Sequence, residues 1–165
     1  MFNICLEETW LDYPTPDGNA IAIIMTGCEH HCPGCHSPNL QKEDTYSDTP
    51  EQIVEKIKKF ATRADTNKLI LIGGDPLYTS NLPYTHFIVQ KLAQEYDICL
   101  YTGYDIDFVK SLNLGKIKYY KCGKFLKDFS RKSEKTDSCF ILASPNQNFY
   151  DENFNLISNN GILNF

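Results

Sequence analysis

The sequence predicts an α/β protein with a mostly parallel sheet, on two observations. Short runs rich in β-branched and aromatic residues recur along the chain, as expected for strands, and they cover residues 20–26, 68–74, 97–103, 116–121 and 138–144. The first three runs are almost continuously apolar, which is typical of strands covered on both faces of a parallel sheet. Helical patterns lie between the runs, so the order is βαβαβ and the crossovers are expected to be right-handed.

Three helices are expected between these strands. The first begins with a capping box, in which Thr49 is the N-cap, Pro50 is the first helical residue and Gln52 is the third. One face of this helix collects the apolar side chains Ile53, Val54, Ile57, Phe60, Ala61 and Ala64. A second helix is expected over residues 82–96, and a shorter one is expected to begin at Asp105.

Length and composition indicate one globular unit. With 165 residues, 42% hydrophobic and 22% charged, the chain is expected to form a single domain over residues 1–165. Residues 146–165 are rich in Asn and predict a peripheral hairpin or tail that turns at Asn160 and Gly161. The net charge of −5 gives no general attraction to nucleic acid or to an anionic membrane, so a protein partner or a small ligand is expected.

The expected compartment is the cytoplasm. The chain starts without a basic region followed by a long apolar stretch, and no apolar run approaches the ~20 residues that span a bilayer. Its seven cysteines are an odd number, and four of them are scattered along the chain: Cys5, Cys99, Cys122 and Cys139. These four are interpreted as small buried hydrophobic residues in a reducing compartment.

Three unusual segments each follow one of the predicted strands. Cys28, Cys32 and Cys35 come after the first strand, the sequence Gly-Gly-Asp-Pro-Leu (73–77) after the second, and Tyr-Thr-Gly-Tyr (101–104) after the third. Loops at the carboxyl ends of parallel strands form the ligand-binding edge of such a sheet. The three segments are therefore expected to converge on one edge.

The cysteine spacing suits an iron–sulfur cluster. Three thiolates can hold three irons of a 4Fe-4S cluster and leave the fourth iron open to a chelating small molecule. Gly27 and Gly34 would let the loop wrap closely around such a cluster. The Asp75 carboxylate, presented on a Gly-Gly turn, is suited to accept hydrogen bonds from an ammonium group. The ligand implied is amino-acid-like.

These motifs resemble a known family. The spacing Cys28-x3-Cys32-x2-Cys35 is that of radical S-adenosylmethionine (SAM) enzymes, and with segments 73–77 and 101–104 it resembles the activating proteins of anaerobic (class III) ribonucleoside-triphosphate reductase. The segment Ser-Pro-Asn-Gln at 144–147 is similar to a Ser-Asn-Gln segment of that family. The resemblance implies a partial, open (β/α) barrel of the radical SAM type.

The resemblance also implies cofactors, chemistry and partners. SAM would chelate the open iron of a 4Fe-4S cluster, with Gly73, Gly74 and Asp75 holding its methionine part. An electron from a donor such as flavodoxin or ferredoxin would then cleave SAM. The resulting 5′-deoxyadenosyl radical would take a hydrogen atom from a glycine in the large subunit of the reductase.

Further residues have two interpretations each. Thr102 and Tyr104 either pack in the fold or line the ribose and methionine side of SAM, and His36 either lies exposed or rests against the adenine. Asn146 and Gln147 either contact the nucleoside or satisfy loop backbone groups. His30, His31 and His36 are expected to be exposed or packing side chains, although each stands where a fourth metal ligand is plausible.

The sequence departs from the family pattern at two places. The common Gly-Pro-Gly-x-Arg before the first strand reads Pro-Asp-Gly-Asn-Ala over residues 16–20, and the usual Asp-Gly near the fourth strand reads Cys122-Gly123. These changes bear on partner contacts more than on the cluster.

Three alternative functions stay open at this point. One is an activase of a different glycyl radical enzyme. Another is a non-catalytic metal module, in which His30, His31 or His36 completes a Cys3His zinc site. The last is an iron–sulfur electron carrier, which would not need Gly73, Gly74 and Asp75.

Overall fold

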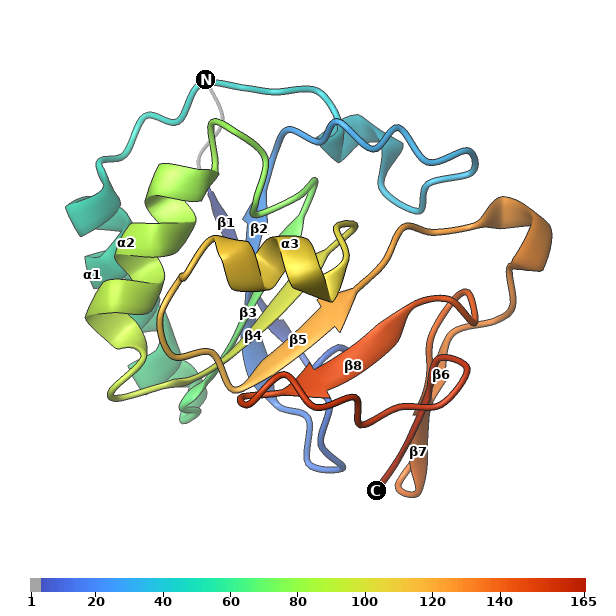
Figure 1. Ribbon diagram of the computed structural model, residues 1–165. Helices are drawn as coiled ribbons and strands as arrows, with labels where there is room; N and C mark the ends of the chain where they lie inside the picture. The colour runs from blue at the N-terminus through green and yellow to red at the C-terminus, as the bar shows by residue number, and fades with distance from the viewer. Residues whose placement is uncertain (1–3) are drawn as a thin grey trace.

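The structure, a computed structural model, describes residues 4–165 and is built on a six-stranded sheet (Figure 1). Its strand order is β1-β2-β3-β4-β5-β8. The strands are β1 (Cys5–Thr9), β2 (Ala20–Met25), β3 (Lys68–Gly73), β4 (Asp97–Thr102), β5 (Tyr119–Cys122) and β8 (Asn148–Asp151). Strands β2 to β5 run parallel, whereas β1 and β8 add antiparallel strands at the two edges.

The register brings the carboxyl ends of the parallel strands to one edge. Met25 at the end of β2 lies opposite Gly73 at the end of β3, and Thr102 at the end of β4 lies opposite Cys122 at the end of β5. The loops that follow these strands therefore leave the sheet side by side, as the strand pattern predicted.

Helices cover one face of this sheet (Figure 1). They are α1 (Pro50–Ala64), α2 (Leu82–Leu92) and α3 (Ile106–Ser111), and two short 3-10 turns, η1 (Pro38–Leu40) and η2 (Lys127–Phe129), lie in loops. Ile53 and Ile57 of α1 pack with Ile88 of α2 on the alternate strand residues that point to this face, such as Ile23 and Leu71. This face holds the main hydrophobic core.

The opposite face is more aromatic and is covered by loops and a second sheet. Tyr13 packs there on Ala20, Ile70 and Cys99, and its hydroxyl donates to Asp97 O at 3.2 Å. Phe149 of β8 belongs to a smaller cluster beside it. The second sheet has the order β6-β7-β9, made of β6 (Glu134–Lys135), β7 (Cys139–Ile141) and β9 (Ile162–Asn164).

The α/β class and the mostly parallel sheet predicted from sequence are confirmed. The capping box of α1 is present, with Thr49 accepting from Gln52 N, and Asp105 caps α3 by accepting from Phe108 N at 2.8 Å. Asn160 and Gly161 both have positive φ, as the predicted turn requires. None of the helices within residues 4–165 combines the length and apolarity that crossing a bilayer demands.

Several elements differ from the prediction. The second helix ends at Leu92 and not at Tyr96, because residues 93–96 turn back so that Asp97 can enter β4. The predicted strand over 116–121 begins only at Tyr119. Residues 146–165 supply β8, which pairs with β5 in the main sheet, as well as β9 of the second sheet.

Candidate functional site

The loop that carries Cys28, Cys32 and Cys35 is fixed to the turn after β3 by backbone hydrogen bonds. Gly74 N donates to Met25 O and Asp75 N donates to Gly27 O, both at 2.8 Å. On its other side the loop is closed by Gly27 N donating to Leu40 O at 2.8 Å. Main-chain hydrogen bonds therefore fix the start of the cysteine loop to the turn after β3 and to Leu40.

The two glycines of the turn are required by this close approach. A Cβ atom on Gly74 would lie 2.3 Å from Gly27 O, and one on Gly73 would lie 2.3 Å from Met25 O. Gly73 also has a φ of 125°, a conformation that favours glycine. Any larger residue at either position would push the cysteine loop away from the sheet.

The three cysteines of the loop are free and half-buried. Cys35 N donates to Cys32 O at 3.1 Å, and burial raises the pKa of the Cys28 thiol. Within residues 4–165, no three His, Cys, Asp or Glu side chains are gathered closely enough to hold a metal ion. The donor set, three unpaired thiols on one loop beside the sheet edge, fits a cluster with three thiolate ligands.

Asp75 is the centre of the site. It is 1% exposed, and both of its carboxylate oxygens accept hydrogen bonds from the protein. Leu77 N donates to Oδ1 at 2.8 Å and Gly103 N to Oδ2 at 2.9 Å, while Thr102 Oγ1 lies 3.0 Å from both oxygens. His30 Nε2 lies 2.8 Å from Oδ2. One carboxylate thus joins the loops that follow β2, β3 and β4.

Asn81 is a second buried connection behind this carboxylate. Its Nδ2 donates to Thr26 O at 2.8 Å and to Asp75 O at 2.7 Å, and its Oδ1 accepts from Tyr46 Oη at 2.6 Å. The buried hydroxyl of Thr26, two residues before Cys28, has no hydrogen-bond partner in the described part of the chain. The main chain before the cysteine loop is therefore held firmly, while one polar atom beside it stays unused.

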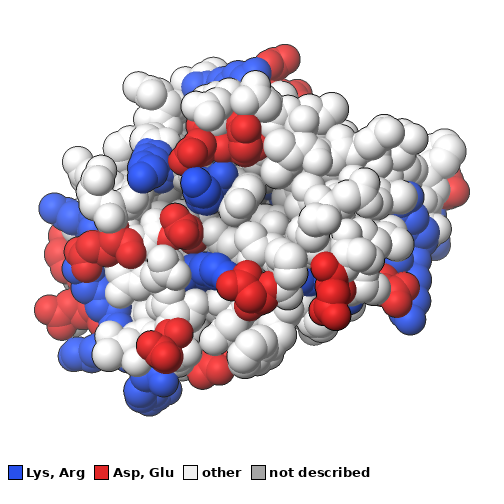
Figure 2. Space-filling view, turned by 90° about the horizontal axis from the view of Figure 1, so that it is seen from below, with Lys and Arg blue, Asp and Glu red and all other residues white. Residues whose placement is uncertain are grey.

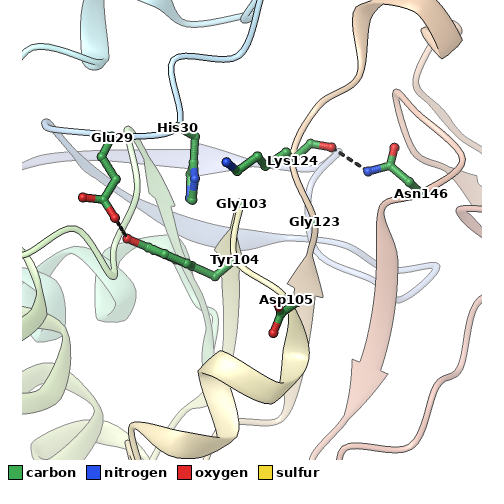
Figure 3. Close-up of a pocket in the computed structure, with 8 residues that line it drawn as sticks. All are labelled: Glu29, His30, Gly103, Tyr104, Asp105, Gly123, Lys124 and Asn146. Carbon is green, nitrogen blue, oxygen red and sulfur yellow. Dashed lines mark hydrogen bonds between the residues drawn. The ribbon is translucent and has the colours of Figure 1, made fainter.

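An open cleft of about 680 Å³ lies over this edge of the sheet (Figure 3). Glu29, His30, Gly103, Tyr104, Asp105, Gly123, Lys124 and Asn146 line it. The Tyr104 hydroxyl donates to Glu29, and its ring meets His30 edge-on with centroids 4.5 Å apart. Lys124 extends from the other wall toward His30, and Asn146 Nδ2 donates to Lys124 O at 2.8 Å (Figure 3). The cleft thus offers both acidic and basic groups to a ligand.

Lys121 on β5 is an unexpected charge on the aromatic face. Its Nζ lies 5.4 Å from the centroid of the Tyr101 ring, and the residue pairs with Phe149 of β8. It makes no hydrogen bond or ion pair with the rest of residues 4–165, and burial lowers its pKa to about 8. The ring contact offsets only part of the cost of burying this ammonium group.

The predicted cofactor-binding residues lie in three different places. Gly73, Gly74, Asp75 and Thr102 lie together beside the cysteine loop. Asn146 lines the far side of the cleft, whereas His36 is exposed and does not line it.

Three residues were missed or misjudged from sequence. His30 was expected to be exposed or to pack, and it does pack against Tyr104 with its side chain 5% exposed, but its bond to Asp75 was not predicted. Asn81 lies within a helix-start pattern that gives no hint of its three bonds. Lys121 lies in a run that indicated only a strand.

Comparison with known proteins agrees with this architecture. A family model described as 4Fe-4S single cluster domain matches residues 16–149. The chain belongs to this family. The match covers most of the chain and includes Cys28, Cys32 and Cys35, and it confirms the predicted 4Fe-4S cluster.

Individual relatives of this 4Fe-4S protein carry one common name, anaerobic ribonucleoside-triphosphate reductase-activating protein. The relative from Haemophilus influenzae is 31% identical over 133 residues, which cover 70% of this chain and 83% of the relative. The one from Salmonella typhimurium is 27% identical over 72% of this chain and 82% of its own length. The relative from Escherichia coli K12 is 26% identical over 74% of this chain and 85% of its own length. No solved structure matches the chain significantly.

The central place of Asp75 predicts a large loss of stability on its removal. In Asp75→Ala the amides of Leu77 and Gly103 and the Thr102 hydroxyl lose their acceptor, so the free energy of unfolding is expected to fall by about 3 kcal/mol. Asp105→Ala, which removes only an exposed helix cap, is expected to lose about 1 kcal/mol. Urea unfolding of both variants measures the difference, and equal losses would contradict the role assigned to Asp75.

Replacing the buried Lys121 is expected to stabilise the protein by an amount that depends on pH. Because its pKa is lowered to about 8 in the fold, the unfolded chain binds this proton more tightly, and the cost of burying the charge is fully present below pH 8 and disappears as pH rises toward its ordinary pKa. Lys121→Met is expected to raise the free energy of unfolding of the metal-free protein by about 2 kcal/mol at pH 7, with a smaller gain at higher pH. Lys118→Met, which removes an exposed ion pair with Glu152, is the control and is expected to give no such gain in stability at pH 7.

Proposed function

We propose that this protein is a radical SAM activase that generates the glycyl radical of an anaerobic ribonucleoside-triphosphate reductase. The observation that carries the proposal is the joining, through Asp75, of the cysteine loop, the Gly-Gly-Asp turn and the Thr102–Gly103 loop beside one open cleft. Membership of the 4Fe-4S single cluster family and the shared name of the relatives support it.

Cys28, Cys32 and Cys35 are the proposed cluster ligands. They are free, lie on one loop and stand beside the sheet edge where a ligand binds. When bound, the cluster and SAM supply the electron transfer and the 5′-deoxyadenosyl radical that removes a hydrogen atom from glycine. The chain's own part is to present the three thiols on one loop and to keep water from the reacting atoms.

The proposed SAM site lies between the cysteine loop and the cleft. The backbone of Gly73 and Gly74 borders it, and Asp75 contacts the methionine ammonium only if His30 leaves Oδ2, because both oxygens are otherwise occupied. Thr102 acts through Asp75, to which its hydroxyl donates.

The far wall of the cleft is the proposed place for the rest of SAM. Asn146 and Lys124 lie there, and the ammonium group of Lys124 can donate hydrogen bonds to ribose hydroxyls or adenine ring nitrogens (Figure 3). A contact of His36 with the adenine stays a proposal, since that side chain lies outside the cleft lining.

Further parts of the proposal concern shape, partners and location. The aromatic face of the sheet, away from the helices, would be the inside of a partial, open (β/α) barrel. The partner would be the large subunit of the reductase, and a low-potential carrier such as flavodoxin or ferredoxin would supply the electron. Free thiols throughout the described chain suit the reducing cytoplasm as its compartment.

The cluster assignment predicts a selective effect of cysteine substitution. Cys28→Ala, Cys32→Ala and Cys35→Ala are each expected to abolish the brown 4Fe-4S absorption and the bound iron after anaerobic reconstitution. Cys5→Ala, Cys99→Ala and Cys139→Ala are expected to keep both. Equal loss of iron from the two sets, or a colourless protein that binds zinc, would reject the assignment.

The activity is tested by electron paramagnetic resonance. Cluster-loaded protein, dithionite, SAM and the reductase of the same genome are expected to give a glycyl doublet on the reductase together with 5′-deoxyadenosine. A doublet that appears only with another glycyl radical enzyme would change the substrate. If SAM is not cleaved with any partner, this protein is better interpreted as an iron–sulfur electron carrier.

A further inference from the structure

A basic segment lies against the cysteine loop of this otherwise acidic protein. Residues 124–132 hold Lys124, Lys127, Arg131 and Lys132 with Asp128 as their one acidic residue, although the whole chain has a net charge of −5. Figure 2 shows Lys and Arg side chains interspersed with Asp and Glu over the face of the molecule seen from below. The charge of this segment is therefore opposite to that of the protein as a whole.

The basic segment is held on both sides. At its far end Arg131 Nε donates to Leu142 O and Arg131 N to Ala143 O, both at 2.8 Å, which fixes it to the second sheet. In its middle, Lys127 packs on the cysteine loop, because a Cβ atom on Gly34 would lie 3.2 Å from Lys127 Cδ. Gly34 stands between Cys32 and Cys35, so the segment touches the proposed cluster ligands' own loop.

The exposed part of the basic segment combines charge with apolar surface. Leu126 is 40% exposed and Phe129 is 65% exposed, and Lys127 and Lys132 of the same segment are exposed as well. An apolar centre with a charged rim is the usual composition of a protein docking surface. Since the rim is basic, the matching partner is acidic.

The proposed reaction needs an electron donor that docks close to the cysteine loop. One electron must enter from outside, and the family has a single cluster, so no second centre in the matched region relays it. Electron transfer weakens steeply with distance, and the donor must therefore dock against the cysteine loop. One electron leaves the donor and enters the cluster, and no bond or proton changes. We propose that the basic segment, residues 124–132, is the docking surface of an acidic one-electron carrier protein.

The reductase fits the cleft better than this segment. Glu29 and Asp105 line the cleft together with Lys124, so its walls do not select an acidic partner. Lys127, Phe129 and Lys132 lie outside the cleft lining. The electron and the glycine would thus arrive at adjacent but different surfaces.

The inference rests on the proposed function, and a binding measurement separates the two. Isothermal titration of cluster-loaded protein with flavodoxin, and separately with ferredoxin, gives the dissociation constant at low salt. Lys127→Glu/Lys132→Glu is expected to weaken binding at least tenfold, and the wild-type affinity is expected to fall with added salt. Lys59→Glu/Lys116→Glu, with the same charge change on α1 and before β5, is expected to stay within twofold.

A further variant, Phe129→Ala, and the radical yield with dithionite distinguish a loss of docking from damage to the cluster. Phe129→Ala is expected to weaken binding severalfold without changing the salt dependence, and both docking variants are expected to keep full iron content. With dithionite in place of the carrier, their glycyl radical yield is expected to match wild type. Unchanged carrier binding, or a matching loss with dithionite, would overturn the docking surface. Wild-type protein that binds the carrier but forms no radical with dithionite would overturn the proposed function instead.

Discussion

The buried carboxylate of Asp75 is the interaction on which the arrangement of the site depends. A buried charge with 1% exposure is costly unless its lone pairs accept hydrogen bonds, and here four groups from three loops lie within hydrogen-bond distance of them. Removing any one loop from its place leaves the carboxylate short of a partner. The three loops are therefore coupled, although each has little regular structure of its own.

The meeting of the three loops at the carboxyl ends of the strands could be predicted from sequence, because it follows from the hydrophobic pattern and the parallel topology. Continuous apolar runs indicated parallel strands, and parallel strands place Cys28, Gly74 and Thr102 at one edge. The partners of Asp75 could not be predicted, since they depend on side-chain directions in loops. His30 is the clearest case, because only the fold shows that its ring reaches a residue 45 positions away.

The edge strands were missed for a related reason. Strand β1 is half-exposed and carries Glu7 and Glu8, so it lacks the apolar run that marked its neighbours. Strand β8 lies in an Asn-rich stretch and joins the sheet mainly through Phe149, which is completely buried. Antiparallel edge strands of this kind are stabilised by their partners more than by their own composition.

The uneven charge of the protein has a consequence for how a carrier would arrive. Salt screens both the repulsion from the net charge of −5 and the attraction of the basic segment beyond about one Debye length, ~8 Å at physiological salt, so the charges nearest the contact matter most. The repulsion acts on every approach, but the attraction acts only where Lys127 and Lys132 are exposed. Charge would therefore affect the orientation in which the carrier docks more than the strength with which it binds. Such weak, oriented contact suits a donor that must leave after each electron and free the neighbouring cleft for the reductase.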